Sequence, residues 1–453
     1  MSNIVEPKTL PGFMELMPQD QILFDKIKNI IEEVYSSYGF YNLDTPLIES
    51  SNVLLAKAGG ETEKQIYRFN KGDNDLSLRF DLTVPLAKYV AARYNELVFP
   101  FKRYQIGKVY RGERPQKGRF REFYQCDIDV IGKDSLSFLY DAEIPCIISK
   151  IFKKIDIGDF VIRINNRKIL TGFFDSLELS ENITDILRII DKLDKVGIDA
   201  VKDMLKEINI DDESIKKIVA FISIKGTNEE TIKKLENLGI ENETYDQGLS
   251  ELKTVINNLS YMDIDDNSYE IDLTIARGLD YYTGTVYETL LRDYPKIGSV
   301  CSGGRYDNLA SYYTDKKLPG VGISIGLTRL FYQLKESNII KSEESSVADV
   351  VVLPLTQNYE YIYKVVNELR SNEIKTDVCF MDKGFKQLLK YANKQNIDYS
   401  VIIGDNEIEK NIAILKNMKT GEQVEVDSTD IVNCYYDLKE KANPKKLVNK
   451  KND

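Results

Sequence analysis

Histidine is absent from this chain of 453 residues, and so is tryptophan. Without an imidazole, the protein cannot contain a Ser-His-Asp triad, an H-E-x-x-H zinc site or a histidine that acts as a general base. Any proton transfer must therefore use another group, such as a carboxylate or an oxygen of the substrate itself.

Cysteine is scarce, and its five residues are scattered without any C-x-x-C spacing: Cys126, Cys146, Cys301, Cys379 and Cys434. This pattern argues against a zinc site or a disulfide framework and favours a reducing compartment. No apolar run approaches the roughly 20 residues of a membrane helix. The amino-terminal segment also lacks the charged and apolar regions of a signal peptide. We therefore expect a cytoplasmic protein outside the membrane, with no metal ligands from His or Cys.

Positive charge is in deficit, since 61 Lys and Arg residues face 72 Asp and Glu residues, a formal net charge of −11. A nucleic-acid partner would have to bind through local basic patches. The acidic total does not exclude a large RNA that is selected by its shape. The length and the 42% hydrophobic content indicate a globular protein of two to four domains.

The pattern of apolar residues changes along the chain and predicts an α+β fold. Helical spacing predicts a helix over residues 20–37, and strand-like runs follow at 76–79, 102–111, 125–131, 159–165, 269–274 and 284–291. Charged amphipathic helices fill most of the region from about residue 175 to 260. We therefore expect one β-rich domain built from residues 1–165 and 266–335, interrupted by a helical insertion over residues 166–265.

The carboxyl-terminal part has a different pattern of predicted elements. A polar linker is expected over residues 336–346, and the apolar run that follows reads as a buried parallel strand. Helices at 358–371 and 384–396 then alternate with strands at 375–380 and 399–403. This predicts a small α/β domain over residues 347–437. Residues 438–453 are expected to form a disordered basic tail.

A dense group of cations occupies the stretch between two predicted strands. Five Arg and Lys residues fall within eleven positions, from Arg111 to Arg121, and Pro115 and Gly118 indicate a loop. Such a run in an acidic chain favours anionic ligands or partners. A solvated hairpin tip is the alternative.

Alternation in the next strand places Gln125, Asp127 and Asp129 on one face, which implies water or a polar ligand there. Two further stretches carry pocket-like chemistry. Residues 277–282 read Arg-Gly-Leu-Asp-Tyr-Tyr, and residues 301–307 read Cys-Ser-Gly-Gly-Arg-Tyr-Asp. Together they supply a fixed cation and three phenols, with glycines that permit close backbone approach.

These stretches resemble the two histidine-specific signatures of histidyl-tRNA synthetases, and the resemblance extends over the whole chain. Residues 39–49 resemble motif 1 of class II synthetases, residues 110–123 motif 2 and residues 320–330 motif 3. The resemblance implies the class II antiparallel catalytic sheet, an anticodon-binding domain at the carboxyl terminus and a homodimer. Several stretches look more like the archaeal and eukaryotic branch, notably aspartate rather than glutamate at Asp81.

The resemblance also implies a histidine site. In the family, the positions of Asp81 and Thr83 receive the α-amino group of the substrate, and Gln125 holds the amino-acid backbone. Asp129 would accept an N–H of the imidazole, and Tyr282 would serve the other ring nitrogen. The expected histidine-binding set is Asp81, Thr83, Arg111, Gln125, Asp129, Arg277, Tyr281, Tyr282 and Tyr306. On local grounds, Asp81 reads almost equally well as the cap of a helix that follows it.

Three arginines are expected to act on phosphates as the catalytic groups: Arg111, Arg277 and Arg329. By resemblance, Arg111 grips the α-phosphate and the substrate carboxylate, Glu113 helps hold the adenine, and Arg329 contacts the γ-phosphate. The expected ATP-binding set is therefore Arg111, Glu113 and Arg329, with Mg²⁺ as the accompanying ion. No Walker-type phosphate loop is present.

Transfer RNA is the remaining expected partner. In the motif 2 loop, Gln116, Lys117, Arg119 and Arg121 are expected to approach its acceptor end. Lys386 and Lys390 lie on one face of a predicted helix with Lys383 and Lys394, and could meet the anticodon arm. A merely solvated face is the alternative.

The implied reaction joins L-histidine to ATP as histidyl-adenylate and then transfers the histidyl group to the 3′-terminal adenosine of tRNA(His). An enzyme without histidine could be translated without its own product, although drift of composition is the favoured explanation of the absence. The alternative function is that of the regulatory paralogue of ATP phosphoribosyltransferase. That paralogue normally lacks the carboxyl-terminal domain and an intact Arg-Gly-Leu-Asp-Tyr-Tyr, and this chain has both.

Overall fold

The computed structural model describes residues 4–56, 61–114, 117–275, 282–342, 346–381 and 383–442. The chain divides into two compact units. One consists of residues 1–15 and 27–340, and the other of residues 16–26 and 341–453. None of the helices in the described ranges combines the length and apolar character needed to cross a bilayer.

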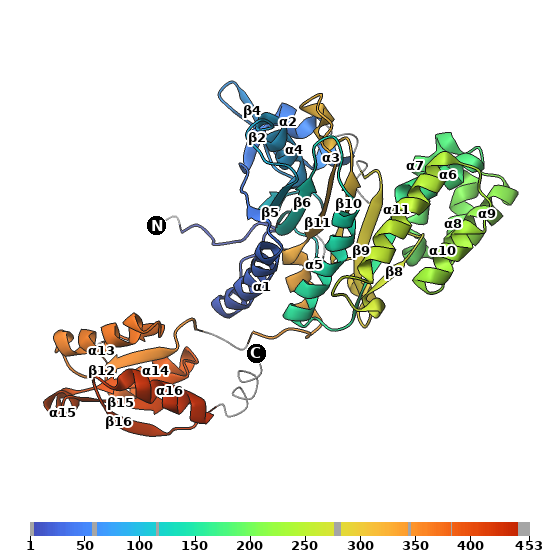
Figure 1. The fold of residues 1–453 in the computed structure, drawn as a ribbon. Coiled ribbons are helices and arrows are strands. Elements are labelled where there is room, and N and C mark those ends of the chain that lie inside the picture. Colours follow the sequence, from blue (N-terminus) through green and yellow to red (C-terminus); the bar gives the residue numbers. More distant parts are fainter. Residues whose placement is uncertain are drawn as a thin grey trace. The chain divides into compact units, whose positions relative to one another are not determined.

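An eight-stranded sheet forms the centre of the first unit (Figure 1). Its order is β1-β5-β6-β11-β10-β9-β7-β8, antiparallel from β5 to β7 and parallel at both edges. The strands are β1 (Tyr41–Asn42), β5 (Phe101–Tyr110), β6 (Glu122–Ile131), β7 (Phe160–Asn166), β8 (Tyr269–Ile271), β9 (Thr285–Leu291), β10 (Cys301–Tyr306) and β11 (Gly320–Ile325). The predicted mixed fold with an antiparallel catalytic sheet is confirmed.

The predicted strands agree with this sheet to within a few residues. The strand expected over residues 269–274 ends earlier, at Ile271, because Asp272 turns the chain. Its carboxylate accepts the backbone N–H of Thr274 at 2.9 Å. A smaller sheet holds the strand expected near residue 76, with the order β2 (Ile48–Ser50), β4 (Asn74–Leu78), β3 (Arg68–Lys71).

Helices pack on the large sheet and fix its strands. The phenol of Tyr35, in α1, donates to the carbonyl of Cys126 in β6 at 2.9 Å. Helix α5 contacts β10 and β11, and helix α12 contacts β6. The helices of this part are α1 (Pro18–Ser37), α2 (Ser51–Leu55), α3 (Glu61–Gln65), α4 (Thr83–Ala92), α5 (Leu139–Ile155) and α12 (Leu327–Glu336). Short 3₁₀ helices occur at η1 (Ser180–Asn182), η2 (Asp266–Ser268), η3 (Pro295–Ile297) and η4 (Leu309–Tyr312).

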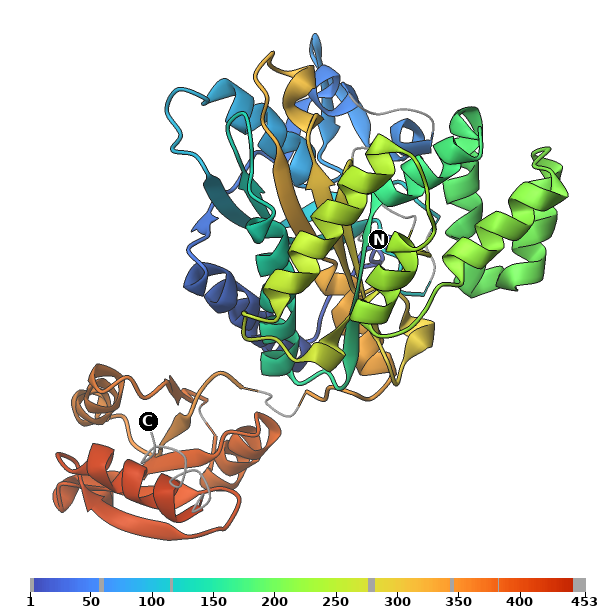
Figure 2. The same cartoon turned by 45° about the vertical axis from the view of Figure 1, so that its right-hand side comes forward.

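The region expected to be a helical insertion is helical, and Figure 2 shows it to one side of the sheet. Its helices are α6 (Arg167–Ser176), α7 (Ile183–Ile190), α8 (Leu193–Glu207), α9 (Asp212–Ile222), α10 (Asn228–Glu236) and α11 (Glu243–Leu259). Local sequence sets their starts: Asp211 caps α9, and Thr227 with Glu230 forms a capping box at α10.

Helices α6 and α11 pack tightly as an antiparallel pair, which we call the insertion stem. A β-carbon at Gly172 would lie 2.4 Å from the backbone nitrogen of Tyr245, and one at Gly248 would lie 2.6 Å from that of Ile169. At the base of the stem, buried Glu251 accepts from Asn166 and Lys168. Glycine is therefore required at both crossing points of the stem.

The second unit contains a five-stranded sheet with the order β13-β12-β14-β15-β16. Its strands are β12 (Val350–Pro354), β13 (Thr376–Val378), β14 (Tyr399–Ile403), β15 (Ile412–Asn417) and β16 (Gln423–Asp427), of which the first three are parallel. Its helices are α13 (Tyr359–Ser371), α14 (Phe385–Lys394), α15 (Asp405–Glu409) and α16 (Ile431–Ala442). Residues 350–353 are fully buried and alternate between two apolar clusters, as the unbroken apolar run predicts.

The expected start of a disordered tail at residue 438 is wrong. Helix α16 continues to Ala442, because Leu438 packs into the same apolar cluster as Tyr435 and its side chain is 3% exposed. Residues 443–453 lie outside the described residues.

Candidate active site

The β5–β6 hairpin sets the geometry of the site. Its strands pair residue for residue from Phe101 opposite Ile131 to Tyr110 opposite Glu122, so the basic loop lies at its turn, as predicted. This register places Arg103 opposite Asp129, Gln105 opposite Asp127 and Gly107 opposite Gln125. The predicted polar face of β6 is confirmed, because Gln125, Asp127 and Asp129 all line one cavity.

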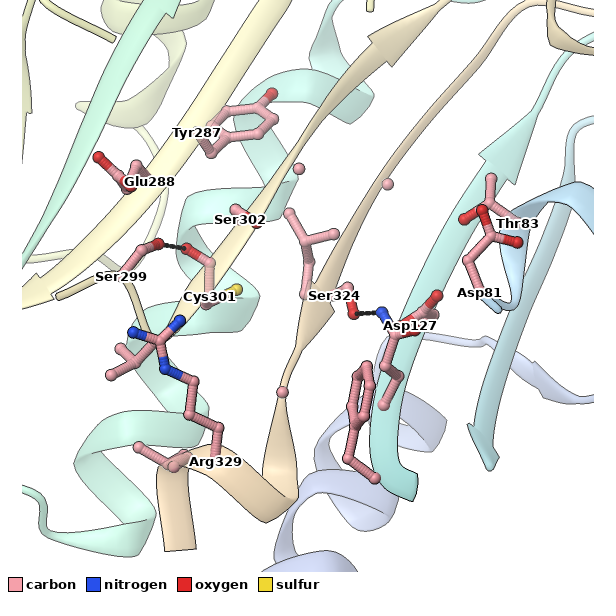
Figure 3. A pocket seen from close by; sticks show the side chains of 18 of the residues that line it. Asp81, Thr83, Asp127, Tyr287, Glu288, Ser299, Cys301, Ser302, Ser324 and Arg329 are labelled. Atoms are coloured by element: carbon pink, nitrogen blue, oxygen red, sulfur yellow. Dashed lines mark hydrogen bonds between the residues drawn. The ribbon is translucent and has the colours of Figure 1, made fainter. Parts of the chain in front are cut away.

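The cavity has a volume of about 570 Å³ and lies over the centre of the large sheet. Figure 3 shows Asp81 and Thr83 at one end, and Glu288, Ser299 and Arg329 at the other. Ten of the residues expected in the site line it: Asp81, Thr83, Arg111, Glu113, Arg119, Gln125, Asp129, Tyr282, Tyr306 and Arg329.

Glycines in β10 and β11 make room for this cavity. Gly322 lies opposite Asp129, and a β-carbon there would be 2.4 Å from the Asp129 carboxylate and 2.2 Å from a backbone oxygen. A β-carbon at Gly320 would lie 2.4 Å from the ring of Tyr306. Such separations are far below van der Waals contact, so neither position accepts a side chain without rearrangement.

Asp129 is held by two partners. Oδ2 is 2.9 Å from Nη2 of Arg103, and Oδ1 accepts the phenol of Tyr306 at 2.7 Å. Arg103 also donates to the carbonyl of Leu82 at 3.0 Å. The sequence reasoning missed Arg103. Its signal was an arginine at the centre of a predicted strand, but that arginine joins the site only through the register with β6.

Three buried carboxylates share this end of the cavity. Burial raises the pKa of Asp127 to about 7 and the pKa values of Asp81 and Asp129 to about 6. The guanidinium of Arg103 acts in the opposite direction on the pKa of all three. The group is therefore close to its titration range at neutral pH, and its charge depends on the cation beside it.

Two neighbouring side chains each have one buried oxygen that accepts no hydrogen bond from the described residues. Asp81 Oδ1 accepts the backbone N–H of Val84 at 3.0 Å, whereas Oδ2 is buried without a hydrogen-bond partner among the described residues. Gln125 donates to the hydroxyl of Ser324 at 2.7 Å, and its Oε1 is buried and likewise without a partner in the described part of the chain. Buried acceptors of this kind suit a ligand that carries N–H donors.

Arg111 enters the cavity from the end of β5. Its Nε donates to the carbonyl of Phe80 at 3.0 Å, and its guanidinium lies over the ring of Phe123 at 5.1 Å. These contacts orient the planar group. Glu113 lies nearby and forms a loose ion pair with Arg119, at 3.6 Å.

At the opposite end, Arg329 lies in the first turn of α12, directly after β11. Its guanidinium donates to the carbonyl of Ile297 at 3.1 Å, and so does the amide of Gln333. Residues 320–330 therefore form a strand-to-helix turn that brings an arginine to the cavity.

The remaining expected residues fall into two groups: three that are outside the described part of the chain, and four whose positions are described. Arg277, Tyr281 and Gln116 are outside the described residues. Lys117 pairs with Glu336 on the surface at 3.3 Å, and Arg121 donates to the carbonyl of Glu113 at 3.1 Å and packs against Gly12. Neither lines the cavity. Lys386, Lys390 and Lys394 are exposed on α14, in the second unit. Lys383 is exposed too, but the expectation that it belongs to the same helix is wrong, because α14 begins at Phe385 after Gly384.

Arg305, from the second signature, has a structural role. It is buried and forms an ion pair with Asp141 of α5 under the ring of Phe138, outside the cavity lining. Within the described ranges, no group of three His, Cys, Asp or Glu side chains is arranged to hold a metal ion.

Comparison with known proteins identifies two family segments. Residues 12–330 match the family model described as histidyl-tRNA synthetase, and residues 349–435 match an anticodon binding domain. A protein of Clostridium tetani named histidine–tRNA ligase is 56% identical over 422 residues, which are 93% of this chain and 96% of that protein. The crystal structure of histidyl-tRNA synthetase from a Nostoc species has a TM-score of 0.89 and 42% identity, over 96% of this chain and all of that one.

A third similarity concerns the alternative function. A Bacillus halodurans structure titled as an ATP phosphoribosyltransferase regulatory subunit/histidyl-tRNA synthetase has a TM-score of 0.71, with 19% identity over 87% of this chain and 97% of that one. At 19% identity, this match shows only that the two proteins share a fold. These relatives are bacterial, so the expected likeness to the archaeal and eukaryotic branch is not supported.

A family model that spans most of the catalytic unit, a relative identical at more than half of the aligned positions and a full-length structural match therefore agree. This chain belongs to the histidyl-tRNA synthetase family.

Proposed function

We propose that this chain activates L-histidine with ATP and transfers it to the 3′-terminal adenosine of tRNA(His). The observation that carries the proposal is the cavity itself, where buried carboxylates and the amide oxygen of Gln125 lie at one end together with Arg111, and Arg329 lies at the other end. Together with membership of the family, this arrangement suits a zwitterionic amino acid beside a triphosphate.

The end of the cavity that contains the buried carboxylates is assigned to the substrate histidine. Oδ2 of Asp81 and Oε1 of Gln125 are buried acceptors for the α-amino group, with Thr83 beside them. Asp129 accepts an imidazole N–H, and the phenol of Tyr282 serves the other ring nitrogen. Tyr306 supports Asp129 through its hydroxyl. Such a site rejects apolar analogues, because they would leave buried polar groups unpaired.

The phosphate chemistry is assigned to arginines. A carboxylate oxygen of histidine attacks the α-phosphorus, and pyrophosphate leaves. Arg111 holds the α-phosphate and the attacking carboxylate, Arg277 assists at the same phosphate, and Arg329 binds the γ-phosphate. Glu113 accepts from the adenine. These groups work by position and by charge neutralisation, which accounts for most catalysis of phosphoryl transfer.

Magnesium accompanies ATP and screens its phosphate charge. It is usually held by one or two carboxylates together with substrate phosphates, so the site need not be a dedicated cage. Glu288 is the carboxylate suited to it, since it lies at the same end of the cavity as Arg329 (Figure 3).

In the second step, the terminal ribose hydroxyl attacks the activated carbonyl and AMP leaves. The proton goes to a phosphate oxygen of the adenylate, because arginines already fix that phosphate and the chain contains no imidazole. Gln116, Lys117, Arg119 and Arg121 receive the acceptor end, and Lys386 and Lys390 receive the anticodon arm. The protein works as a homodimer in the cytoplasm.

Two assays on one preparation test the proposal. Histidine-dependent exchange of pyrophosphate into ATP should be observed without tRNA, and charging of tRNA(His) should follow when it is added. Exchange with no preference for histidine among the amino acids would contradict the proposal, as would exchange that never leads to charging.

A further inference from the structure

Arg103 is a completely buried cation within the cavity wall. Its side chain is 0% exposed, and Nη2 is shared between Asp129 Oδ2, at 2.9 Å, and the carbonyl of Leu82, at 3.0 Å. Its Nε and Nη1 are buried and have no hydrogen-bond partner among the described residues. An arginine that leaves two donors unused inside a protein is expensive for stability.

The carboxylate that Arg103 contacts is also fixed from the other side. Tyr306 donates to Oδ1 of Asp129 at 2.7 Å, and the absence of a side chain at Gly322 leaves that oxygen close to the β11 backbone. With a partner at each oxygen, the carboxylate has a single orientation. Its remaining lone pairs serve any ligand that enters the cavity.

Among the described residues, the other ionisable groups that act on Asp129 and its neighbours at this end do not include a second cation next to Asp129. Asp81 and Asp127 are carboxylates, and Tyr282 and Tyr306 are phenols. The charge of Arg103 favours the ionised form of all three carboxylates, against burial. Without it, Asp129 would take up a proton readily, and a protonated carboxyl group is a donor where the imidazole requires an acceptor.

We propose that Arg103 is a positioning residue for amino-acid selection: it holds Asp129 as an oriented, ionised acceptor for the imidazole N–H of histidine. The inference rests on the proposed function of this cavity. A purely structural role explains the position less well, because replacing a buried ion pair by well-packed apolar residues is often neutral or stabilising. Lysine could supply the charge, but its compact ammonium is more strongly hydrated than a guanidinium and is therefore less suited to a completely buried position.

Four variants test the inference by pyrophosphate exchange: Arg103→Met, Arg103→Lys, Asp129→Asn and the double variant. Arg103→Met should raise KM for histidine by about 30-fold or more, as expected for an orphaned buried charge, and change KM for ATP less than about twofold. Arg103→Lys should recover part of the loss. In the Asp129→Asn background, Arg103→Met should add less than about threefold, because the carboxylate through which it acts is gone.

Arg305→Met is the matched control. Arg305 is an equally buried arginine paired with Asp141, outside the cavity lining. It should lower the thermal unfolding temperature without a selective rise in KM for histidine. If Arg103→Met does not fold, the double variant leaves no orphaned charge, and Arg103→Lys alone should still raise KM for histidine by at least about fivefold.

Equal effects of Arg103→Met on both substrates, or fully additive effects with Asp129→Asn, would overturn the inference. A failure of the proposed function looks different, because the unmodified protein would then show no histidine-dependent exchange. If the unmodified protein is active but Asp129→Asn keeps a normal KM for histidine, Asp129 is not the acceptor and the inference falls with it.

Discussion

Asp81 and Val84 are joined by a hydrogen bond from the backbone N–H of Val84 to Oδ1 of Asp81, 3.0 Å long, at the first turn of α4. The second oxygen of the same carboxylate is buried and has no partner among the described residues. The two local interpretations of Asp81, as a helix cap and as a residue of the site, are therefore compatible. Each uses one oxygen.

This division can be tested by comparing two substitutions of Asp81. Asp81→Asn keeps an oxygen for the cap but removes the charge that would meet an ammonium group, so KM for histidine should rise at least about tenfold with little change in stability. Asp81→Ala should show the same rise and also lose about 1 kcal/mol of unfolding free energy with the cap. Pyrophosphate exchange and urea denaturation measure the two effects. Equal stability of both variants would rule out the cap.

Substitution of Arg111 tests the phosphate assignment. The guanidinium is already oriented by Phe80 and Phe123, so Arg111→Lys keeps the charge but loses the fork. We expect kcat for exchange to fall by about 100-fold, with a smaller change in KM for ATP. Arg93→Lys, at an exposed arginine that pairs with Glu96 and does not line the cavity, is the control and should have little effect on this step. A change confined to the KM for ATP would contradict the role at the reacting phosphate.

Gly320→Ala should weaken histidine binding indirectly, by displacing Tyr306. Its β-carbon would lie 2.4 Å from the ring of Tyr306, which must then move away from Asp129. KM for histidine should rise by about tenfold or more while KM for ATP stays close to normal, because overpacking is relieved by shifts of side chains and backbone that would misplace this ring. Gly384→Ala is the control, because nothing lies within 4 Å of its β-carbon position. A Gly320→Ala enzyme with normal kinetics would show that the ring position is unimportant.

Charge reversal on α14 separates tRNA binding from chemistry. Lys386→Glu with Lys390→Glu should reduce charging of tRNA(His), reduce its dependence on salt, and leave pyrophosphate exchange intact. Lys375→Glu with Lys410→Glu reverses two exposed charges elsewhere in the same unit and serves as the control. If both pairs reduce charging equally, the effect comes from net charge and α14 is not a specific tRNA contact.

Stability should depend on pH through Asp127. Burial raises its pKa from 3.8 to about 7, so between these values the folded protein holds a proton that the unfolded chain releases. The unfolding free energy should therefore fall as pH rises through this window, by at most about 1.4 kcal/mol per pH unit. Asp127→Asn removes the term, so its stability relative to the unmodified protein should improve from pH 5 to pH 8 in urea denaturation. A constant difference would show that Asp127 is ionised throughout.

The sequence predicted those parts of the site that depend on one segment at a time. Alternation alone places Gln125, Asp127 and Asp129 on one face, and Pro115 and Gly118 indicate the loop between two strands. The apolar run at residues 350–353 likewise predicts a strand buried on both faces. Such patterns follow from the period of a single strand or the chemistry of a single turn.

Features that depend on pairing between segments could not be predicted in this way. Arg103 lies in the site because the hairpin register places it opposite Asp129. Arg305 does not line the cavity, because it forms an ion pair with Asp141 of α5 instead. A sequence with two arginines in two strands does not say which one faces a cavity. The end of α16 is a further example: the lysine-rich composition predicts a tail from residue 438, but Leu438 packs into an apolar cluster and the helix continues past it.

The insertion stem has a consequence for how the length of this protein can vary. Helices α6 and α11 run side by side and are locked by Gly172 and Gly248, so the end of α6 and the start of α11 are brought together away from the sheet. Helices α7 to α10 form the connection between these two ends. A short linker from Ser176 to Glu243 could replace them, at the cost of two hydrogen bonds between Asn228 and the edge strand β8 and of the ring stack between Phe173 and Phe221. The fold therefore carries a site for deletion, exchange or enlargement of whole helices that leaves its catalytic architecture in place.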